Sequence, residues 1–195
     1  MEEKKFNPEN LNRLNNPVRL KEFPAELVLK LTGIQKPEVI IDIGAGTAFF
    51  SISFADLFVN CKIFACDISD IMINWIEINI KPKYSNIFPL KMEEIKVPLE
   101  NNIADFLFMV NLHHELNNPE ETISECNRLL KPGGKIAISD WRKEMSDRGP
   151  SYELKVNTED IEKQLQNAGF NNISHYIDFP NNFLVIAEKP ENAYL

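Results

Sequence analysis

Residues 39 to 52 read VIIDIGAGTAFFSI, and this stretch decides the fold. A β-branched run ends at Ile43, and Gly44 and Gly46 separate it from apolar residues that follow at helical spacing. Short β-branched runs of this kind are typical of buried strands. Glycines between a strand and a helix permit a sharp turn and let a ligand approach the bare backbone. The stretch therefore predicts a strand, a ligand-binding turn and a helix.

The same plan repeats along the next hundred residues. The run KIFACD (62–67) is strand-like, and Ser69 is a suitable N-cap for a helix over 69–80. Because strands that alternate with helices pair in parallel, the pattern predicts a sheet covered on both faces. The further elements expected are strands at 86–91, 104–110 and 135–140 and a helix near 119–130.

The last third of the chain carries a different signal. A helix is expected from about Thr158 to Ala168, followed by strands at 172–178 and 182–188. Only Phe179 to Asn181 separate these strands, which is too short for a parallel crossover, so the pair must be antiparallel. The sequence thus predicts a doubly wound, Rossmann-like α/β sheet, mostly parallel, with an antiparallel last strand.

The chain length favours one domain, since 195 residues are few for two. Residues 1–36, interrupted by Pro8, Pro17 and Pro24, are expected to form a helical cap. Residues 37–140 would form the cofactor-binding half, and 141–195 a loop, a helix and the terminal hairpin. The cap and the loop at 141–152 are expected to border a substrate pocket.

Composition excludes several classes of partner. The net charge of −8 argues against binding to nucleic acid or to anionic lipid. The N-terminal MEEKKFNPEN has no apolar stretch typical of a secretory signal, and no run reaches membrane-spanning length, so a cytoplasmic protein is expected. The three cysteines form no C-x-x-C pair and are interpreted as reduced thiols, and no set of metal ligands is predicted.

The glycine turn does not fit two common nucleotide motifs. The dinucleotide fingerprint G-x-G-x-x-G would require glycine at position 49, where this chain has Phe49. A phosphate-binding P-loop needs a G-K-[ST] string, which the sequence lacks. Asp67, 21 residues after Gly46, ends the second strand at the distance where a carboxylate can accept both ribose hydroxyls. An adenosine-containing ligand is therefore predicted.

The sequence resembles the class I S-adenosylmethionine-dependent methyltransferases, and within them the broad ubiquinone/menaquinone-type group. The resemblance covers about residues 38–188 and implies seven strands with the last antiparallel. The segments that carry it are DIGAGTA (42–48), CDIS (66–69), ADFLFMVNLHHEL (104–116), RLLKPGGKIAISDW (128–141) and NAGF (167–170).

The resemblance implies a cofactor, S-adenosylmethionine, and residues that hold its methionine end. Gly44 and Gly46 would lie under the methionine moiety, and Asp42 would help to hold its ammonium group. Asn111, just past the fourth strand, would lie near the same end.

It also implies contacts to the adenosine end. Asp67 would bind the ribose hydroxyls, and Ile68 would pack on adenine. Met92 and Glu93 fall where the family contacts the adenine edge. Lys91 departs from the family pattern, because many members carry an acidic residue there.

The presence or absence of glycine matters at two further turns of the chain. Ala48 stands where many members of the family have a third glycine. Gly133 and Gly134 in the KPGG segment are interpreted as the left-handed turn that ends a helix before the fifth strand.

Two histidines follow the fourth strand in NLHHEL (111–116). Methyl transfer is an in-line displacement that depends mainly on positioning, and a base is useful when the acceptor must lose a proton. His113 and His114 are therefore candidate catalytic bases, although packing or helix capping is an alternative role.

These observations favour a methyltransferase acting on a small-molecule acceptor. Two alternatives share part of the evidence: a non-catalytic module that binds S-adenosylmethionine or its demethylated product, and a nicotinamide-dependent oxidoreductase. Phe49 and the terminal hairpin oppose the latter.

Overall fold

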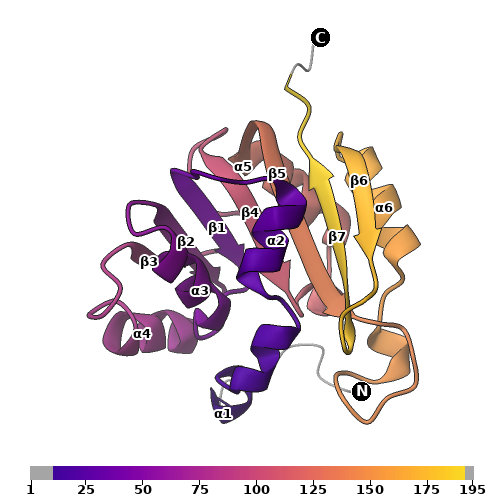
Figure 1. Cartoon of the computed structure of the whole chain (residues 1–195), viewed down its shortest axis with the longest axis horizontal. Helices are drawn as coiled ribbons and strands as arrows, with labels where there is room; N and C mark the ends of the chain where they lie inside the picture. The colour runs from indigo at the N-terminus through magenta and orange to yellow at the C-terminus, as the bar shows by residue number, and fades with distance from the viewer. Residues whose placement is uncertain (1–10, 192–195) are drawn as a thin grey trace.

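A computed structural model describes residues 11–191 of the chain as helices and strands around one sheet (Figure 1). Pro8 and the other residues of the expected cap before position 11 lie outside this range. The strands are β1 (Val39–Ile43), β2 (Lys62–Asp67), β3 (Ile87–Lys91), β4 (Ala104–Val110), β5 (Leu130–Trp141), β6 (Asn171–Tyr176) and β7 (Asn182–Glu188). The α-helices are α1 (Leu11–Leu14), α2 (Ala25–Thr32), α3 (Phe49–Leu57), α4 (Asp70–Asn79), α5 (Pro119–Leu129) and α6 (Thr158–Asn167). Short 3-10 helices are η2 (Pro17–Lys21), η3 (His113–Glu115) and η4 (Tyr152–Leu154).

The sheet has seven strands in the order β3-β2-β1-β4-β5-β7-β6. The pairs β1–β2, β1–β4, β2–β3 and β4–β5 are parallel, whereas β7 is antiparallel to both β5 and β6. The order reverses at β1, which pairs with β2 on one side and β4 on the other. The predicted doubly wound sheet with an antiparallel last strand is therefore confirmed.

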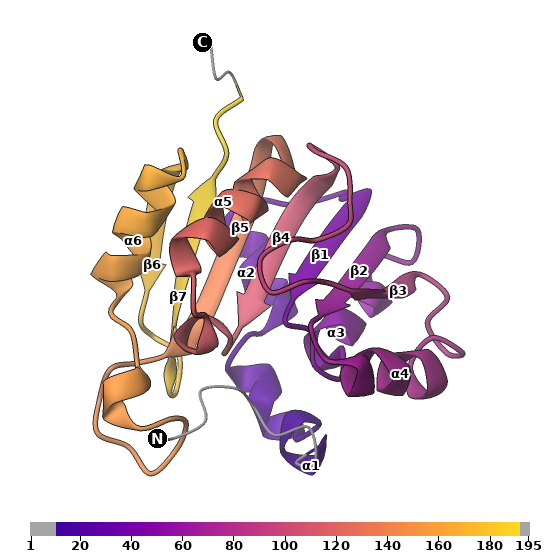
Figure 2. The ribbon, with the colours of Figure 1, turned by 180° about the vertical axis from the view of Figure 1, so that it is seen from behind.

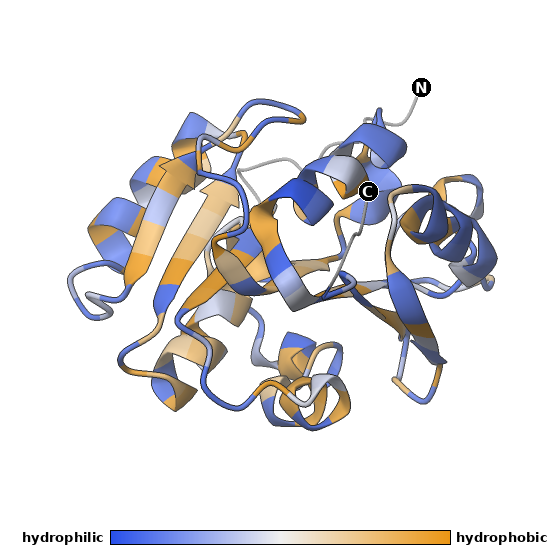
Figure 3. Ribbon diagram, turned by 90° about the horizontal axis from the view of Figure 1, so that it is seen from above, coloured by the Kyte–Doolittle hydropathy of each residue, from blue (hydrophilic) through white to orange (hydrophobic). Residues whose placement is uncertain are grey.

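Helices cover both faces of the sheet because successive side chains of its central strands point to opposite faces and both sets are buried. On β1, Ile40 packs with α2, α3 and α4, and Ile41 packs with α5 and α6. Figure 1 shows α2 and α3 in front of the sheet, and Figure 2 shows α5 and α6 on the other side. The strands are mostly hydrophobic along their length, while the helices present hydrophilic outer surfaces (Figure 3).

The N-terminal segment is anchored to the sheet through aromatic packing. The buried Phe23, between η2 and α2, contacts the rings of Phe50, Phe54 and Phe108 at centroid distances of 5.8, 6.1 and 5.3 Å. Aromatic pairs at these distances add to the free energy of area burial. This packing holds α1 and η2 beyond the carboxyl ends of the strands (Figure 1).

The KPGG segment differs from its predicted role. Helix α5 ends at Leu129, and Leu130 is already extended with φ −73° and ψ 140°. Gly133 has a left-handed backbone, φ +76°, but it lies inside β5, near a shift in the β4–β5 pairing. The expectation that these glycines end the helix is therefore wrong, because an extended residue ends it three positions earlier.

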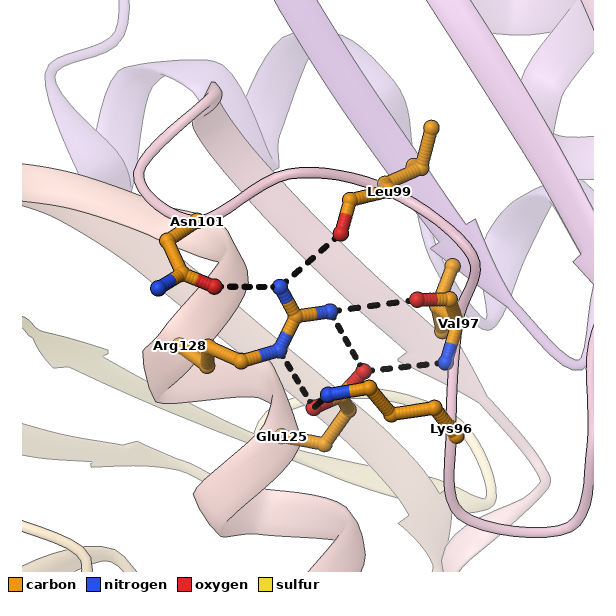
Figure 4. A network of polar contacts seen from close by, with 6 residues as sticks. All are labelled: Lys96, Val97, Leu99, Asn101, Glu125 and Arg128. Atoms are coloured by element: carbon orange, nitrogen blue, oxygen red, sulfur yellow. Dashed lines mark hydrogen bonds and ion pairs between the residues drawn. The ribbon is translucent and has the colours of Figure 1, made fainter.

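An ion-pair network fixes the loop between β3 and β4 (Figure 4). The guanidinium of Arg128 on α5 reaches across to this loop and pairs with the buried carboxylate of Glu125. Glu125 also accepts a hydrogen bond from the backbone of Val97 at 2.9 Å. The other acceptors of Arg128 are the carbonyls of Val97 and Leu99 and the side chain of Asn101.

We expect Arg128→Met to lower the free energy of unfolding by about 2 kcal/mol, because it leaves the buried Glu125 carboxylate and two loop carbonyls without their main donor. Denaturant unfolding measures this change, and hydrogen exchange is expected to rise first in residues 92–103. Lys163→Met, at an exposed position on α6, is the matched control and should cost less than about 0.5 kcal/mol. Equal stability of the two variants would contradict the role given to the network.

Candidate active site

A cavity of about 860 Å³ lies at the carboxyl ends of β1, β2 and β4. Ligands of doubly wound sheets bind at this edge, beside the point where the strand order reverses. The cap and the 141–151 loop contribute further walls, and both lie at this end of the sheet in Figure 1. The predicted site residues that line the cavity are Asp42, Gly44, Gly46, Asp67, Ile68, Met92, Asn111 and His114.

The turn after β1 has the left-handed backbone that glycine favours. Gly44 has φ +69° and Gly46 has φ +55°. A Cβ atom on Gly44 would come within 2.7 Å of the Leu112 side chain, so the absence of a side chain at Gly44 lets Leu112 pack closely against the turn. Both glycines line the cavity, and the binding of a ligand over this turn stays a prediction.

 Ala48 has φ +58° and ψ 26°, a left-handed conformation at the N-cap of α3. This backbone costs an alanine about 1 kcal/mol relative to glycine, which explains why glycine is common at this position in the family that the sequence resembles. The Cβ of Ala48 is fully buried in the core beneath α3, and its burial offsets part of that cost.

The carboxylate of Asp67 links the first two strands at the cavity. Its Oδ2 accepts a hydrogen bond from the Gly46 amide at 2.8 Å, and its Oδ1 accepts one from the Ser69 amide at 2.8 Å. Each carboxylate oxygen has a second lone pair for a ligand hydroxyl. Burial raises the pKa of Asp67 above its ordinary value, although these amide hydrogen bonds oppose the shift.

Asp42 is the second buried acid beside the turn. Its Oδ2 accepts a hydrogen bond of 2.6 Å from the Ser51 hydroxyl on α3. Burial raises the pKa of Asp42 to about 8; the Ser51 hydrogen bond opposes this shift, and the charge of Asp67 adds to it. The raised pKa favours the protonated form of the Asp42 carboxyl.

The residues expected near adenine occupy different positions. Ile68 lines the cavity with 39% of its surface exposed, and the buried Met92 lines it as well. Glu93 is exposed and lies outside the residues that line the cavity, whereas its neighbour Glu94 lines it. The sequence analysis did not single out Glu94, because the alternation of the loop after β3 cannot be read from spacing alone.

Lys91 has a structural partner in place of the acidic residue that many family members carry. Its ammonium group donates a hydrogen bond of 2.7 Å to the carbonyl of Ile68 and forms a 2.8 Å ion pair with Asp70. These contacts join the end of β3 to the start of α4, next to the cavity.

Asn111 connects the cap to the terminal hairpin. Its backbone is left-handed with φ +55°, and its side-chain amide donates to Glu22 at 3.3 Å and accepts from Asn182 at 2.6 Å. Glu22 is buried, and burial raises its pKa, although the nearby Arg19 opposes the shift. Sequence reasoning missed Glu22, since no motif marks a single acid within the cap.

The structure separates the two histidines. His114 lines the cavity, and its Nδ1 lies 2.8 Å from Oδ1 of the fully buried Asp140, which also accepts the His114 amide at 3.1 Å. Because a carboxylate only accepts, Nδ1 carries a proton and Nε2 of the neutral ring has a lone pair. Burial lowers the pKa of His114, but the hydrogen bond and charge of Asp140 outweigh it and the net pKa is raised.

His113 has a different environment. It is not among the residues that line the cavity, and its Nε2 lies 2.8 Å from the side-chain oxygen of Gln164 on α6. Burial lowers its pKa. Sequence reasoning missed Asp140, which lies one residue before the end of β5 and could have been noticed as an acid at the same sheet edge as the histidines.

Within residues 11–191, no three His, Cys, Asp or Glu side chains gather in a group suited to a metal ion. None of the helices there combines the length and apolar character that crossing a membrane requires. Cys61, Cys66 and Cys126 are buried free thiols.

Comparison with known proteins identifies the class. A solved S-adenosylmethionine-dependent methyltransferase from Aquifex aeolicus is 32% identical, with a TM-score of 0.87 over 95% of this chain and 100% of that one. Fold and site thus define a class I S-adenosylmethionine-dependent methyltransferase, as predicted. Residues 41–138 match the family described as "Methyltransferase domain", and the chain belongs to that family. Membership of this family argues against the alternative of a nicotinamide-dependent oxidoreductase.

Curated relatives match over part of their length. A malonyl-[acyl-carrier protein] O-methyltransferase from Methylococcus capsulatus is 28% identical over 103 residues, which cover 53% of this chain and 37% of the relative. A demethylmenaquinone methyltransferase from Protochlamydia amoebophila is 29% identical over 117 residues, which cover 58% of this chain and 48% of the relative. The matched region therefore spans less than half the length of either relative.

We expect binding of an ammonium-bearing ligand to depend on the ionisation of Asp42. Affinity for S-adenosylhomocysteine should rise about tenfold between pH 6 and pH 8, because the raised pKa of Asp42 leaves its carboxyl neutral at the lower pH. Calorimetric titration across this range measures the change. Asp42→Asn should bind more weakly and show little pH dependence, and a flat profile in the unsubstituted protein would contradict the role of Asp42.

Proposed function

We propose that this protein transfers a methyl group from S-adenosylmethionine to a small-molecule acceptor. When bound, S-adenosylmethionine supplies an electrophilic methyl group on a sulfonium. The observation that carries the proposal is one cavity that is lined both by Asp67 and by His114, whose ring is held by the buried Asp140 behind it.

The residues around the glycine turn fit such a cofactor. Asp67 retains lone pairs for the ribose hydroxyls after accepting two amides, and Ile68 and Met92 offer apolar contact to adenine. Glu94 takes the place first expected for Glu93, because Glu94 lines the cavity and Glu93 does not.

The methionine end would lie over the open backbone of the turn. Gly44 and Gly46 line the cavity there, and Asp42 would receive the ammonium group. Asn111, held between Glu22 and Asn182, borders the same part of the cavity.

His114 acts as a general base in this proposal. Its Nε2 accepts the proton that the acceptor loses, while Asp140 holds the ring orientation and stabilises the imidazolium. His113 supports the scaffold through Gln164 instead. The acceptor therefore belongs to compounds whose nucleophile carries a removable proton, such as a hydroxyl or an acidic carbon.

Several features favour a small acceptor. The cap contributes Leu14 and Glu22 to the cavity walls, and the loop after β5 contributes Arg148 and Ser151. Walls from two separate segments suit an acceptor that enters a pocket. The net charge of −8 opposes a nucleic-acid substrate. The names of the curated relatives specify two different acceptors, so they do not single out one.

We expect Asp67→Ala to weaken binding of S-adenosylmethionine at least tenfold, about 1.4 kcal/mol, because the change removes the proposed ribose acceptor and the partner of the Gly46 amide. Calorimetry measures the dissociation constant. Asp70→Ala, three positions later on the surface of α4, is the matched control and should leave the affinity unchanged. Unchanged affinity in Asp67→Ala would refute the assignment.

We expect His114→Gln and Asp140→Asn to lower turnover, by about 100-fold for the former, while cofactor affinity stays within about twofold, since the loss is one of proton transfer. Transfer of labelled methyl groups to metabolites of a cell extract measures turnover. His113→Gln is the matched control and should retain most activity.

The pH profile adds a second readout of the same assignment. Turnover of the unsubstituted protein should fall as the pH drops through the raised pKa of His114, because the imidazolium cannot accept a proton. Full activity of His114→Gln would exclude the base. Tight cofactor binding with no methyl transfer to any extract would instead favour a non-catalytic binding module.

A further inference from the structure

The loop after β5 brings a cation to the cavity wall next to the end of that strand. Arg148 lies on this loop and is one of the residues that line the cavity. Its neighbour Gly149 has φ +82° and packs so closely on Trp141 that a Cβ atom would come within 2.6 Å of the indole ring. Trp141 also lines the cavity, and it directly follows Asp140, the partner of the His114 ring. The packing of the glycine therefore holds Arg148 next to the end of β5 that orients the proposed base.

The guanidinium of Arg148 is only loosely paired. Its one ion pair within residues 11–191 is with Glu22 of the cap, where Nη2 lies 3.7 Å from Oε1. Half of the surface of the Arg148 side chain is exposed. A half-exposed pair at this distance contributes little free energy, so a ligand anion can replace it at low cost. Arginine has five N–H donors, and those of Arg148 are therefore available to a ligand.

Glu22 cannot neutralise this arginine by itself, because it is shared. Its Oε2 lies 3.7 Å from Nε of Arg19 and accepts a hydrogen bond of 3.3 Å from the side chain of Asn111. One buried carboxylate thus faces two guanidinium groups, and the side chain of Arg148 is the more exposed of the two, 50% against 15%. The cluster therefore leaves Arg148 able to pair with a further anion.

These contacts indicate the chemical class of the acceptor. We propose that Arg148 binds an anionic group of the methyl acceptor, a carboxylate or a phosphate, and so makes the enzyme selective for acidic small molecules. This inference rests on the proposed function. The planar donors of arginine match the paired oxygens of either group. Because the net charge of −8 repels an acidic compound at long range, binding of such a compound depends on a local cation.

A fractionated cell extract tests the proposal before the acceptor is identified. Anion exchange at neutral pH divides the metabolites of the extract into a retained, acidic fraction and an unretained fraction. Transfer of labelled methyl groups from S-adenosylmethionine is then measured with dilutions of each fraction. The unsubstituted protein should methylate a compound of the retained fraction only. Phosphatase treatment of that fraction distinguishes the two anionic groups, because it abolishes the transfer if the acceptor is a phosphate ester and leaves it intact if the acceptor is a carboxylate.

A substitution of the arginine tests its role directly. Arg148→Met should raise the half-saturating amount of the retained fraction by about tenfold or more, while turnover at saturation stays within about threefold and the dissociation constant of S-adenosylmethionine within about twofold. Lys143→Met is the matched control and should behave like the unsubstituted protein, since Lys143 is a cation of the same loop but is not among the residues that line the cavity. If Arg148→Met does not unfold cooperatively in a thermal melt, Arg148→Gln provides the same test.

Transfer to compounds of the unretained fraction would overturn the inference and leave the proposed function standing. An unchanged half-saturating amount in Arg148→Met and Arg148→Gln would also overturn it. A loss of S-adenosylmethionine binding as large as the loss for the acceptor would do the same, because it indicates a structural role for Arg148. Absence of transfer from the unsubstituted protein to either fraction would contradict the proposed function itself, and the inference with it.

Discussion

The hydrogen bond from the Gly46 amide to the Asp67 carboxylate is the contact on which the site depends. It joins the turn after β1 to the end of β2, across the edge where a parallel sheet collects its ligands. The Ser69 amide binds the other oxygen of the same carboxylate, so one side chain orders the turn and the start of α4 together. Because glycine lacks a Cβ atom, the turn can adopt a left-handed backbone at Gly44 and Gly46 and present the Gly46 amide to this acid.

The cavity contains buried acids. Burial raises their pKa values, and the positive charge of Arg19 opposes this shift. Asp42 and Glu22 are buried acids, and Arg19, in η2 of the cap, interacts electrostatically with both. Buried charges are costly unless they are paired. The ion pair of Arg19 with Glu22 therefore offsets part of the cost of burying both groups beside the cavity.

The sequence predicted the fold well because the fold depends on patterns that stand close together in the chain. The β-branched run at 39–43, the glycines after it and the short connection expected at 179–181 are local signals, and all three predicted their elements. Several site residues were missed because they depend on contacts between distant segments: Glu22 meets Asn111 across 89 positions, and Asp140 meets His114 across 26. Likewise, spacing alone could not show that Glu94 and not Glu93 faces the cavity, or that His113 turns toward α6.

The central claim is that this edge of the sheet is built for S-adenosylmethionine. Parallel calorimetric titrations of the purified protein with S-adenosylmethionine and with NAD test it most directly, because both ligands contain adenosine and differ in what the glycine turn must accommodate. We expect saturable binding of one S-adenosylmethionine per chain and no measurable binding of NAD. A preference for NAD, or no binding of S-adenosylmethionine, would contradict it.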